Sequence, residues 1–257
     1  MRRTSGPLSS PFPILIPHNK GQHMPNSFHF KQFTIHQDRC GMKVGTDGVL
    51  LGAWAKGGKN MLDIGSGTAL IALMLAQRYH EAKITGVELD EQAAQQAKEN
   101  VAASPFAQQV TIENIAIQRF SQNENLHTHF DAIVSNPPFY HSLKSKNHER
   151  TLARHTESLT FNELFEAVSL LLAPEGVFSA VIPTEQKDCF LAEAYIKGLF
   201  VNRLAKVKTV ETKPAKRCLV AFSRIRPERY LEEETTIRNS QGEYTQWYSQ
   251  LTHDFYL

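Results

Sequence analysis

The sequence predicts an α/β protein built on a doubly wound, mostly parallel sheet of seven strands that ends in an antiparallel hairpin. Three observations predict it. Apolar strand-like segments alternate with segments of helical periodicity from residue 61 onward. The first strand runs into a glycine-punctuated turn and a long apolar helix, as at the start of a nucleotide-binding βαβ unit. Acidic or amide residues stand where strands end, which is where ligands bind in open α/β sheets.

Taken in order, the elements follow from these periodicities. We expect strands at 61–65, 83–88, 110–115, 130–135, 176–182, 203–210 and 217–223, and helices at 68–79, 91–103, 161–173 and 184–199. The short connection Lys213-Pro214-Ala215-Lys216 joins the last two strands and predicts the hairpin. Residues 28–257 are expected to form a single domain, because a chain of 257 residues that is 41% hydrophobic can bury one substantial core.

Residues 1–27 differ from the rest of the chain. They contain five prolines and almost no periodicity, so we expect a disordered extension. A start codon assigned too early, with Met24 close to the true start, is an equally good interpretation. The apolar run at 12–16 is too short and too rich in proline for a secretory signal.

Composition limits the function classes. The net charge of +2 allows a nucleic-acid substrate without requiring one. No apolar stretch approaches the roughly 20 residues of a membrane helix. Cys40, Cys189 and Cys218 have neither disulfide nor metal-ligand spacing, which is typical of a reducing compartment. We therefore expect a cytoplasmic protein with no bound metal, and no feature of the sequence indicates an obligatory protein partner.

The most informative motif is Asn136-Pro137-Pro138-Phe139, which follows the strand at 130–135. Proline fixes φ and supplies no N–H, so the carbonyls of this turn point outward. Such a turn suits a planar substrate with an exocyclic –NH2. The Asn136 side-chain oxygen and the Pro137 carbonyl would accept its two hydrogens, and the ring would stack on Phe139. A proline-rich turn with no function is the competing interpretation of the motif alone.

A second motif lies upstream, at Asp63-Ile64-Gly65-Ser66-Gly67. Two glycines let a backbone pass close to a ligand. The third glycine of a dinucleotide fingerprint is missing, and Asp63 would repel a pyrophosphate, so the turn suits a cationic, amino-bearing cofactor better. Glu88 ends the next strand, where a carboxylate can accept both hydroxyls of a ribose.

Together, Asp63-x-Gly65-x-Gly67, Glu88 and Asn136-Pro137-Pro138-Phe139 resemble the class I S-adenosylmethionine-dependent methyltransferases of amino nitrogens, over roughly residues 40–225. The segment Asp38–Trp54 and the C-terminal residues 251–257 are similar to the narrower family of bacterial tRNA1(Val) (adenine-37, N6)-methyltransferases. The resemblance implies a Rossmann-like sheet that ends in an antiparallel hairpin. It also implies methyl transfer from S-adenosylmethionine to the N6 amino group of adenine 37, with S-adenosylhomocysteine as product.

The resemblance also implies roles for individual residues. Asn136, Pro137 and Phe139 are the expected catalytic residues. The cofactor is expected at Asp63, Gly65, Gly67, Glu88 and Asn136, with Thr46, Asp47 and Asn114 as further candidates. Many relatives place an acid at the end of the third strand for the cofactor's adenine, but this chain has Ala116 there; Asn114 or a backbone carbonyl is the expected substitute.

Two basic clusters are candidates for RNA binding. The better one follows the Asn-Pro-Pro-Phe motif and contains Lys144, Lys146, Arg150 and Arg154. The second is spread over residues 203–217. For any single residue, a solvated face is an equally good interpretation.

Other functions stay open at this point. The same four-residue motif occurs in enzymes that methylate release-factor glutamine, guanine in ribosomal RNA and adenine in DNA. The segment Lys43–Trp54 and the absence of a large target-recognition domain favour tRNA. A silent cofactor-binding or RNA-binding module is disfavoured because Asn136 and Asp63 are both present. The aromatic and acidic tail from Tyr230 onward is expected to pack against the sheet.

Overall fold

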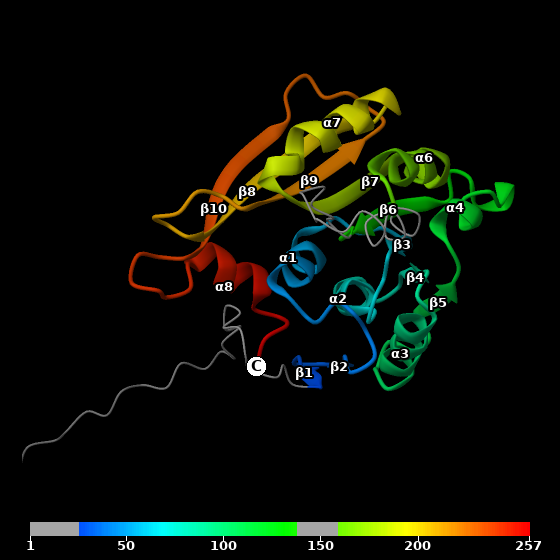
Figure 1. Cartoon of the computed structure of the whole chain (residues 1–257), viewed down its shortest axis with the longest axis horizontal. Coiled ribbons are helices and arrows are strands. Elements are labelled where there is room, and N and C mark those ends of the chain that lie inside the picture. Colours follow the sequence, from blue (N-terminus) through cyan, green and yellow to red (C-terminus); the bar gives the residue numbers. More distant parts are fainter. Residues whose placement is uncertain (1–25, 138–158) are drawn as a thin grey trace, which may run out of the picture.

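A central sheet with helices on both faces organises the computed structural model, which describes residues 26–137 and 159–257 (Figure 1). Its eight strands lie in the order β10-β8-β9-β7-β6-β3-β4-β5. All neighbours pair in parallel except β9, which lies antiparallel between β7 and β8. The strands are β3 (Asn60–Ile64), β4 (Lys83–Glu88), β5 (Val110–Asn114), β6 (Phe130–Ser135), β7 (Leu172–Pro183), β8 (Phe200–Val210), β9 (Arg217–Ser223) and β10 (Leu231–Arg238).

The seven predicted strands and the terminal hairpin of β8 and β9 are confirmed, but the predicted strand number was one too low. The missing strand is β10, which extends the sheet beside β8 in parallel register from Leu231 opposite Arg203 to Arg238 opposite Val210. Its three consecutive glutamates gave no apolar alternation. An edge strand keeps one side in solvent and tolerates such residues, so periodicity alone cannot identify it.

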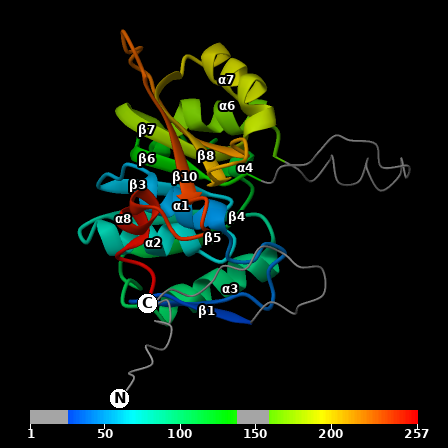
Figure 2. The same cartoon turned by 90° about the vertical axis from the view of Figure 1, so that its left-hand side faces the viewer.

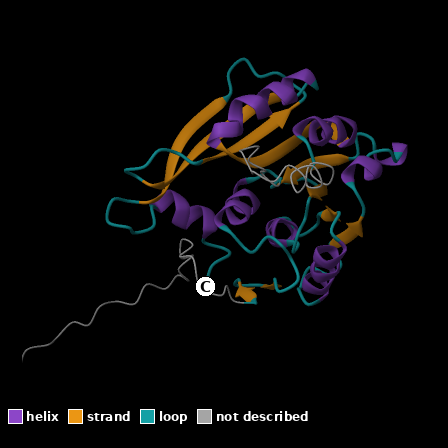
Figure 3. Cartoon of the chain, in the orientation of Figure 1, coloured by secondary structure: helices purple, strands orange, loops and turns teal. Residues whose placement is uncertain are grey.

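Helices cover the two faces with separate apolar cores (Figures 1 and 3). The 3-10 turns Glu124–Leu126 and Thr184–Gln186 complete the helical segments. One face carries α1 (Thr46–Trp54), α2 (Leu70–Arg78), α3 (Glu91–Ala102) and α8 (Gln246–Thr252), and the other carries α4 (Ile117–Phe120), α6 (Phe161–Leu171) and α7 (Lys187–Ile196).

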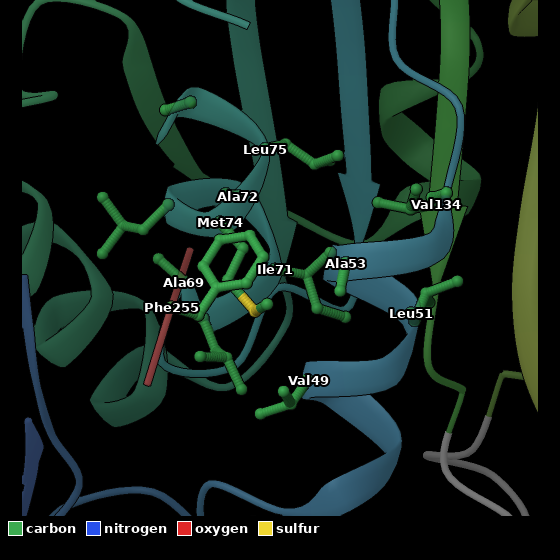
Figure 4. Close-up of a cluster of buried hydrophobic side chains, with 14 of the residues drawn as sticks. Val49, Leu51, Ala53, Ala69, Ile71, Ala72, Met74, Leu75, Val134 and Phe255 are labelled. Atoms are coloured by element: carbon green, nitrogen blue, oxygen red, sulfur yellow. The ribbon is translucent and has the colours of Figure 1, made fainter. Parts of the chain in front are cut away.

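Helix α1 packs very closely on α2, in the apolar cluster drawn in Figure 4. A Cβ at Gly52 would lie only 2.7 Å from the Met74 sulfur, so this contact requires glycine. From Gly48 to Trp54 every residue of α1 is buried, which explains why its sequence shows no polar face. The close packing fixes the start of α1 relative to the glycine turn that precedes α2.

The two ends of the described chain meet on the α2 and α3 side of the molecule. A small hairpin of β1 (Ser27–His29) and β2 (Thr34–His36) lies beside α3 (Figure 2). The Lys31 amide donates to the Phe255 carbonyl at 2.8 Å, and the rings of Phe30 and Tyr256 stack at 6.0 Å. The predicted packing of the C-terminal tail is right for Tyr248, Phe255 and Tyr256, which are buried in the core, but residues 231–238 form strand β10 of the sheet rather than packing against it.

The predicted extension at residues 1–27 lies outside the described residues, apart from its last two. Ser27 already belongs to β1, so the predicted boundary is too late. The single domain stays a prediction. Within residues 26–137 and 159–257, no helix is both long and apolar enough to cross a bilayer.

Candidate active site

Three neighbouring strands deliver the predicted residues to one edge of the sheet. Ile64 at the end of β3 pairs with Val87 of β4 and with Ser135 of β6. The residues that come next, Gly65, Glu88 and Asn136, therefore lie at the same edge. Two bonds tie these strand ends together: the Ser135 hydroxyl donates to the Ile64 carbonyl at 2.9 Å, and the Gly65 amide donates to the Val87 carbonyl at 2.8 Å.

Asp63 lies beneath this edge rather than on its surface, with 0% of the residue exposed. One carboxylate oxygen accepts from the Ala72 amide at 3.1 Å, which attaches the end of β3 to α2. The other oxygen, Oδ1, has no hydrogen-bond partner within the described part of the chain. The pKa of Asp63 is raised to about 7, chiefly by burial. The hydrogen bond from Ala72 acts in the opposite direction, and the nearby Glu88 charge acts in the same direction as burial.

The glycine turn above Asp63 is open. Gly65 and Gly67 have φ values of +72° and +54°, a region that favours glycine. A Cβ built on either residue would meet nothing within 4 Å. The backbone here is thus bare on its outer side, and a ligand could lie directly against it.

Glu88 closes the turn from the neighbouring strand. Its Oε2 accepts from the Gly67 amide at 2.8 Å, and its Oε1 accepts from the Asp90 amide at 2.9 Å. A carboxylate oxygen has a second lone pair, so each oxygen can still accept a hydroxyl donor. The side chain is half-buried and fixed in place, as a ribose-binding carboxylate needs to be.

Asn136 lies on the other side of the site, half-buried, with Pro137 buried behind it. Its Nδ2 donates to the sulfur of Met42 at 3.6 Å, a contact between residues 94 positions apart in the chain. Phe139, the third predicted catalytic residue, lies outside the described residues.

The start of α1 lies next to this pair, since Met42 is only four residues from Thr46. Thr46 is the first residue of α1, and the preceding Gly45 offers no side-chain cap. Asp47 makes an ion pair with Arg217 of β9 at 2.9 Å. The sequence placed Arg217 in a basic cluster, whereas the structure gives it a carboxylate partner.

Asn114 is already engaged in the sheet. Its amide nitrogen donates to the carbonyls of Glu88 and Leu89, at 2.9 and 3.1 Å, and so holds the end of β4 to β5. Ala116 is the residue before the short helix α4 and has no polar side chain to offer a ligand. Within the described residues, Asn114 therefore has a clear structural task, and its cofactor role stays a prediction.

The structure describes only the second of the two basic clusters. Lys144, Lys146, Arg150 and Arg154 lie outside the described residues. In the second cluster, the glutamates of β10 pair with three cations of β8: Arg203 with Glu233 at 3.0 Å, Lys206 with Glu232 at 2.6 Å, and Lys208 with Glu234. Because these cations are paired with glutamates, the second cluster is a weaker candidate for RNA binding.

Comparisons with known proteins identify the family of this chain. The family described as "Methyltransferase small domain" matches residues 43–203. A tRNA1(Val) (adenine(37)-N6)-methyltransferase of Phocaeicola vulgatus is 45% identical over 238 residues, covering 91% of this chain and 99% of that protein. The protein of the same name from Erwinia tasmaniensis is 44% identical over 237 residues, covering 91% of this chain and 96% of its own.

Solved structures support the fold. A predicted O-methyltransferase from Agrobacterium tumefaciens matches with a TM-score of 0.63 at 16% identity, covering 81% of this chain and 96% of that one. TYW2 from Pyrococcus horikoshii, in complex with MeSAdo, matches with a TM-score of 0.52 at 11% identity, covering 76% and 69%. The fold is thus the Rossmann-like fold of class I methyltransferases. The chain belongs to the methyltransferase small-domain family and, within it, to the tRNA1(Val) (adenine(37)-N6)-methyltransferases.

Proposed function

We propose that this chain transfers a methyl group from S-adenosylmethionine to the N6 amino group of adenine 37 in tRNA1(Val). The observation that carries the proposal is the position of the Asn136 amide at the same sheet edge as the glycine turn and Glu88. The names of relatives at 45% and 44% identity support the choice of substrate.

The residues present suit this cofactor. Asp63 would be a buried negative charge, and its Oδ1 has no partner among the described residues, so a cation beyond the turn would balance it. Because Asp63 is fully covered, it would act through its charge across a region of low dielectric rather than through a direct bond. Glu88 would accept the ribose hydroxyls, and the open backbone at Gly65 and Gly67 would lie against the ligand.

When bound, S-adenosylmethionine supplies a methyl group on a positively charged sulfur, from which it leaves readily. The task of the protein is then to prepare and align the amine. The exocyclic nitrogen of adenine is a poor nucleophile because its lone pair is delocalised into the ring. Asn136 Oδ1 and the Pro137 carbonyl would each accept one N–H, which favours a pyramidal nitrogen with a localised lone pair. No strong base is needed, because the proton can leave after methyl transfer.

The target base has to leave its loop to enter such a site. Stacking on Phe139 would contribute about 1–3 kcal/mol, as for other base–aromatic pairs. We assign phosphate contacts to Lys144, Lys146, Arg150 and Arg154, because they follow Pro137 directly in the chain and are not matched by an acidic stretch in the sequence.

Methyl transfer with a labelled methyl donor tests the proposal. The acceptors are a tRNA1(Val) transcript, the same transcript with guanine at position 37, ribosomal RNA, DNA and a release factor. We expect label only in the transcript with adenine 37, recovered as N6-methyladenosine after digestion. Equal labelling of the guanine-37 transcript, or labelling of protein instead, would overturn the proposal.

A further inference from the structure

We infer that Met42 is a positioning residue for the catalytic amide: its sulfur accepts the Asn136 N–H and so turns the amide oxygen toward the substrate. This inference rests on the proposed function, since it concerns how Asn136 receives an amino group.

The chemistry makes the orientation of this amide decisive. A side-chain amide has an oxygen acceptor at one end and an NH2 donor at the other, and a half-turn exchanges them. With the oxygen toward the substrate, Asn136 accepts an N–H of the amine. With the NH2 toward the substrate, two donors face each other and the amine is repelled. Some group must therefore distinguish the two ends.

A thioether is suited to this task. It accepts hydrogen bonds weakly and donates none, so it favours the NH2 end and offers nothing to the oxygen. The structure shows this arrangement, with Asn136 Nδ2 3.6 Å from Met42 Sδ. Among the described residues, no other hydrogen bond of the Asn136 side chain is seen.

The loop that carries Met42 is firmly anchored, although the methionine itself is 52% exposed. Gln37 is buried, and its Oε1 accepts from the Val44 amide at 2.7 Å. The buried Cys40 thiol donates to the Met42 carbonyl at 3.0 Å. The Arg39 amide donates to Gln96 of α3 at 3.0 Å.

This anchoring separates Met42 from an ordinary surface residue. The backbone on both sides is bound to buried groups, while the side chain is left in the open beside the catalytic amide. Because half of Met42 is exposed, it adds little to the core, and the contact that its side chain makes within the described residues is the one with Asn136.

A double-mutant cycle tests the inference. Met42→Leu keeps the shape and removes the acceptor. Asn136→Asp removes the NH2 and leaves oxygen at both ends, so that orientation no longer matters. In the wild-type background we expect Met42→Leu to lower kcat about two- to fivefold, the lower part of the range for one hydrogen bond because a thioether is a weak acceptor, with KM for tRNA unchanged. In the Asn136→Asp background we expect no further loss in single-turnover rates.

Met61→Leu, near the start of β3 and so at the opposite end of this strand from the site, is the control for a methionine-to-leucine change and should leave kcat unchanged. An equal loss from Met42→Leu in both backgrounds would show a packing role and overturn the inference. So would an unchanged kcat, or a rise in KM alone, which would show direct contact with the RNA.

A second measurement does not depend on activity. The side-chain NH2 protons of Asn136, identified by their absence in Asn136→Asp, should shift in an NMR spectrum of Met42→Leu; no shift overturns the inference. If the wild type methylates a different planar amino group, the proposed function fails and the cycle is run on that substrate. If it methylates adenine 37 and Met42→Leu has no effect, only the present inference fails.

Discussion

The two sides of the site differ in how firmly their residues are held. On the cofactor side, Asp63 is fully buried and Glu88 accepts hydrogen bonds from two backbone amides. On the target side, Asn136 is half-buried and donates a hydrogen bond to Met42, which is half-exposed. The first side is built from the ends of adjacent parallel strands, whose register fixes the groups relative to one another. The second side draws on a loop that precedes α1 and on the turn after β6.

The difference indicates that the two sides have different roles, one in cofactor binding and the other in aligning the target base. The cofactor side is pre-formed and carries unbalanced charge, so it is suited to bind a cation before RNA arrives. On the target side the described residues Asn136 and Met42 carry no charge, so they are suited to align the base rather than to attract the cofactor. Substitutions on the two sides should therefore affect different constants, the Kd of the cofactor on one side and kcat on the other.

The largest expected effect is on the target side. Asn136→Ala removes an acceptor that is needed only when the amine is activated, and we expect kcat to fall about 10²–10³-fold, as for loss of other preorganised polar groups. The Kd of S-adenosylmethionine, measured by calorimetry, should change less than about twofold. A large change in that Kd with kcat retained would reverse the assignment of the two sides.

Asp63→Asn is the corresponding change on the cofactor side. A charge interaction across the turn is worth about 1–2 kcal/mol, so cofactor Kd should rise about five- to thirtyfold. Relative to wild type, the cofactor-free variant should gain stability as pH rises from about 4 to 7, reaching about 4 kcal/mol and staying level above pH 7, because the wild type must ionise a buried carboxyl there. Thermal unfolding at pH 8 and pH 5 checks this. A less stable variant at pH 8 would show that the carboxylate holds the fold together.

The same carboxyl predicts a pH dependence of binding. Because burial raises the pKa of Asp63 to about 7, the group loses its charge as pH falls below 7. Only the ionised form attracts a cation, so the Kd of S-adenosylmethionine should rise on acidification, toward the value of Asp63→Asn and no further. Calorimetry from pH 5.5 to 8 measures it. The Asn variant should lack this component, and an identical slope in both proteins contradicts the prediction.

The smallest effects are expected from the charged residues of the two basic clusters and their partners. Gln in place of Lys144, Lys146, Arg150 and Arg154 should weaken tRNA binding and flatten its salt dependence, by roughly one unit of slope for each phosphate that is no longer neutralised. Gln in place of Glu232, Glu233 and Glu234 frees three cations of β8 and is the matched control. It should strengthen non-specific RNA binding slightly, with little change in thermal stability. If the first set has no effect, these four residues do not bind phosphate.

Much of the fold follows from sequence periodicity, because buried parallel strands and the helices between them carry strong apolar patterns. The eighth strand does not, since Glu232-Glu233-Glu234 gives no apolar alternation, and the cations that pair with it, Arg203, Lys206 and Lys208, are identified only by the structure. Those pairs depend on the register of two strands about 30 residues apart.

The site shows the same limit. Asp63, Gly65, Glu88 and Asn136 could be predicted because strand ends converge in this fold class. The burial of Asp63 beneath its turn could not be predicted, nor could the contact of Met42 with Asn136, because both depend on how a loop and a helix pack over the sheet. The ion pair of Asp47 with Arg217 could not be predicted from the sequence for the same reason.

Strand β9 runs against all its neighbours, and this reversal has an evolutionary consequence. The other strands of the sheet end at the edge that carries Gly65, Glu88 and Asn136. Strand β9 begins at this edge with Arg217, just after the bend at 211–216. Residues inserted near the tip of that bend would lie at this edge, while Lys216 at its end stays bound to the Val207 carbonyl and the Thr184 amide. It is a natural place for descendants of this enzyme to acquire a new preference for the RNA that they modify.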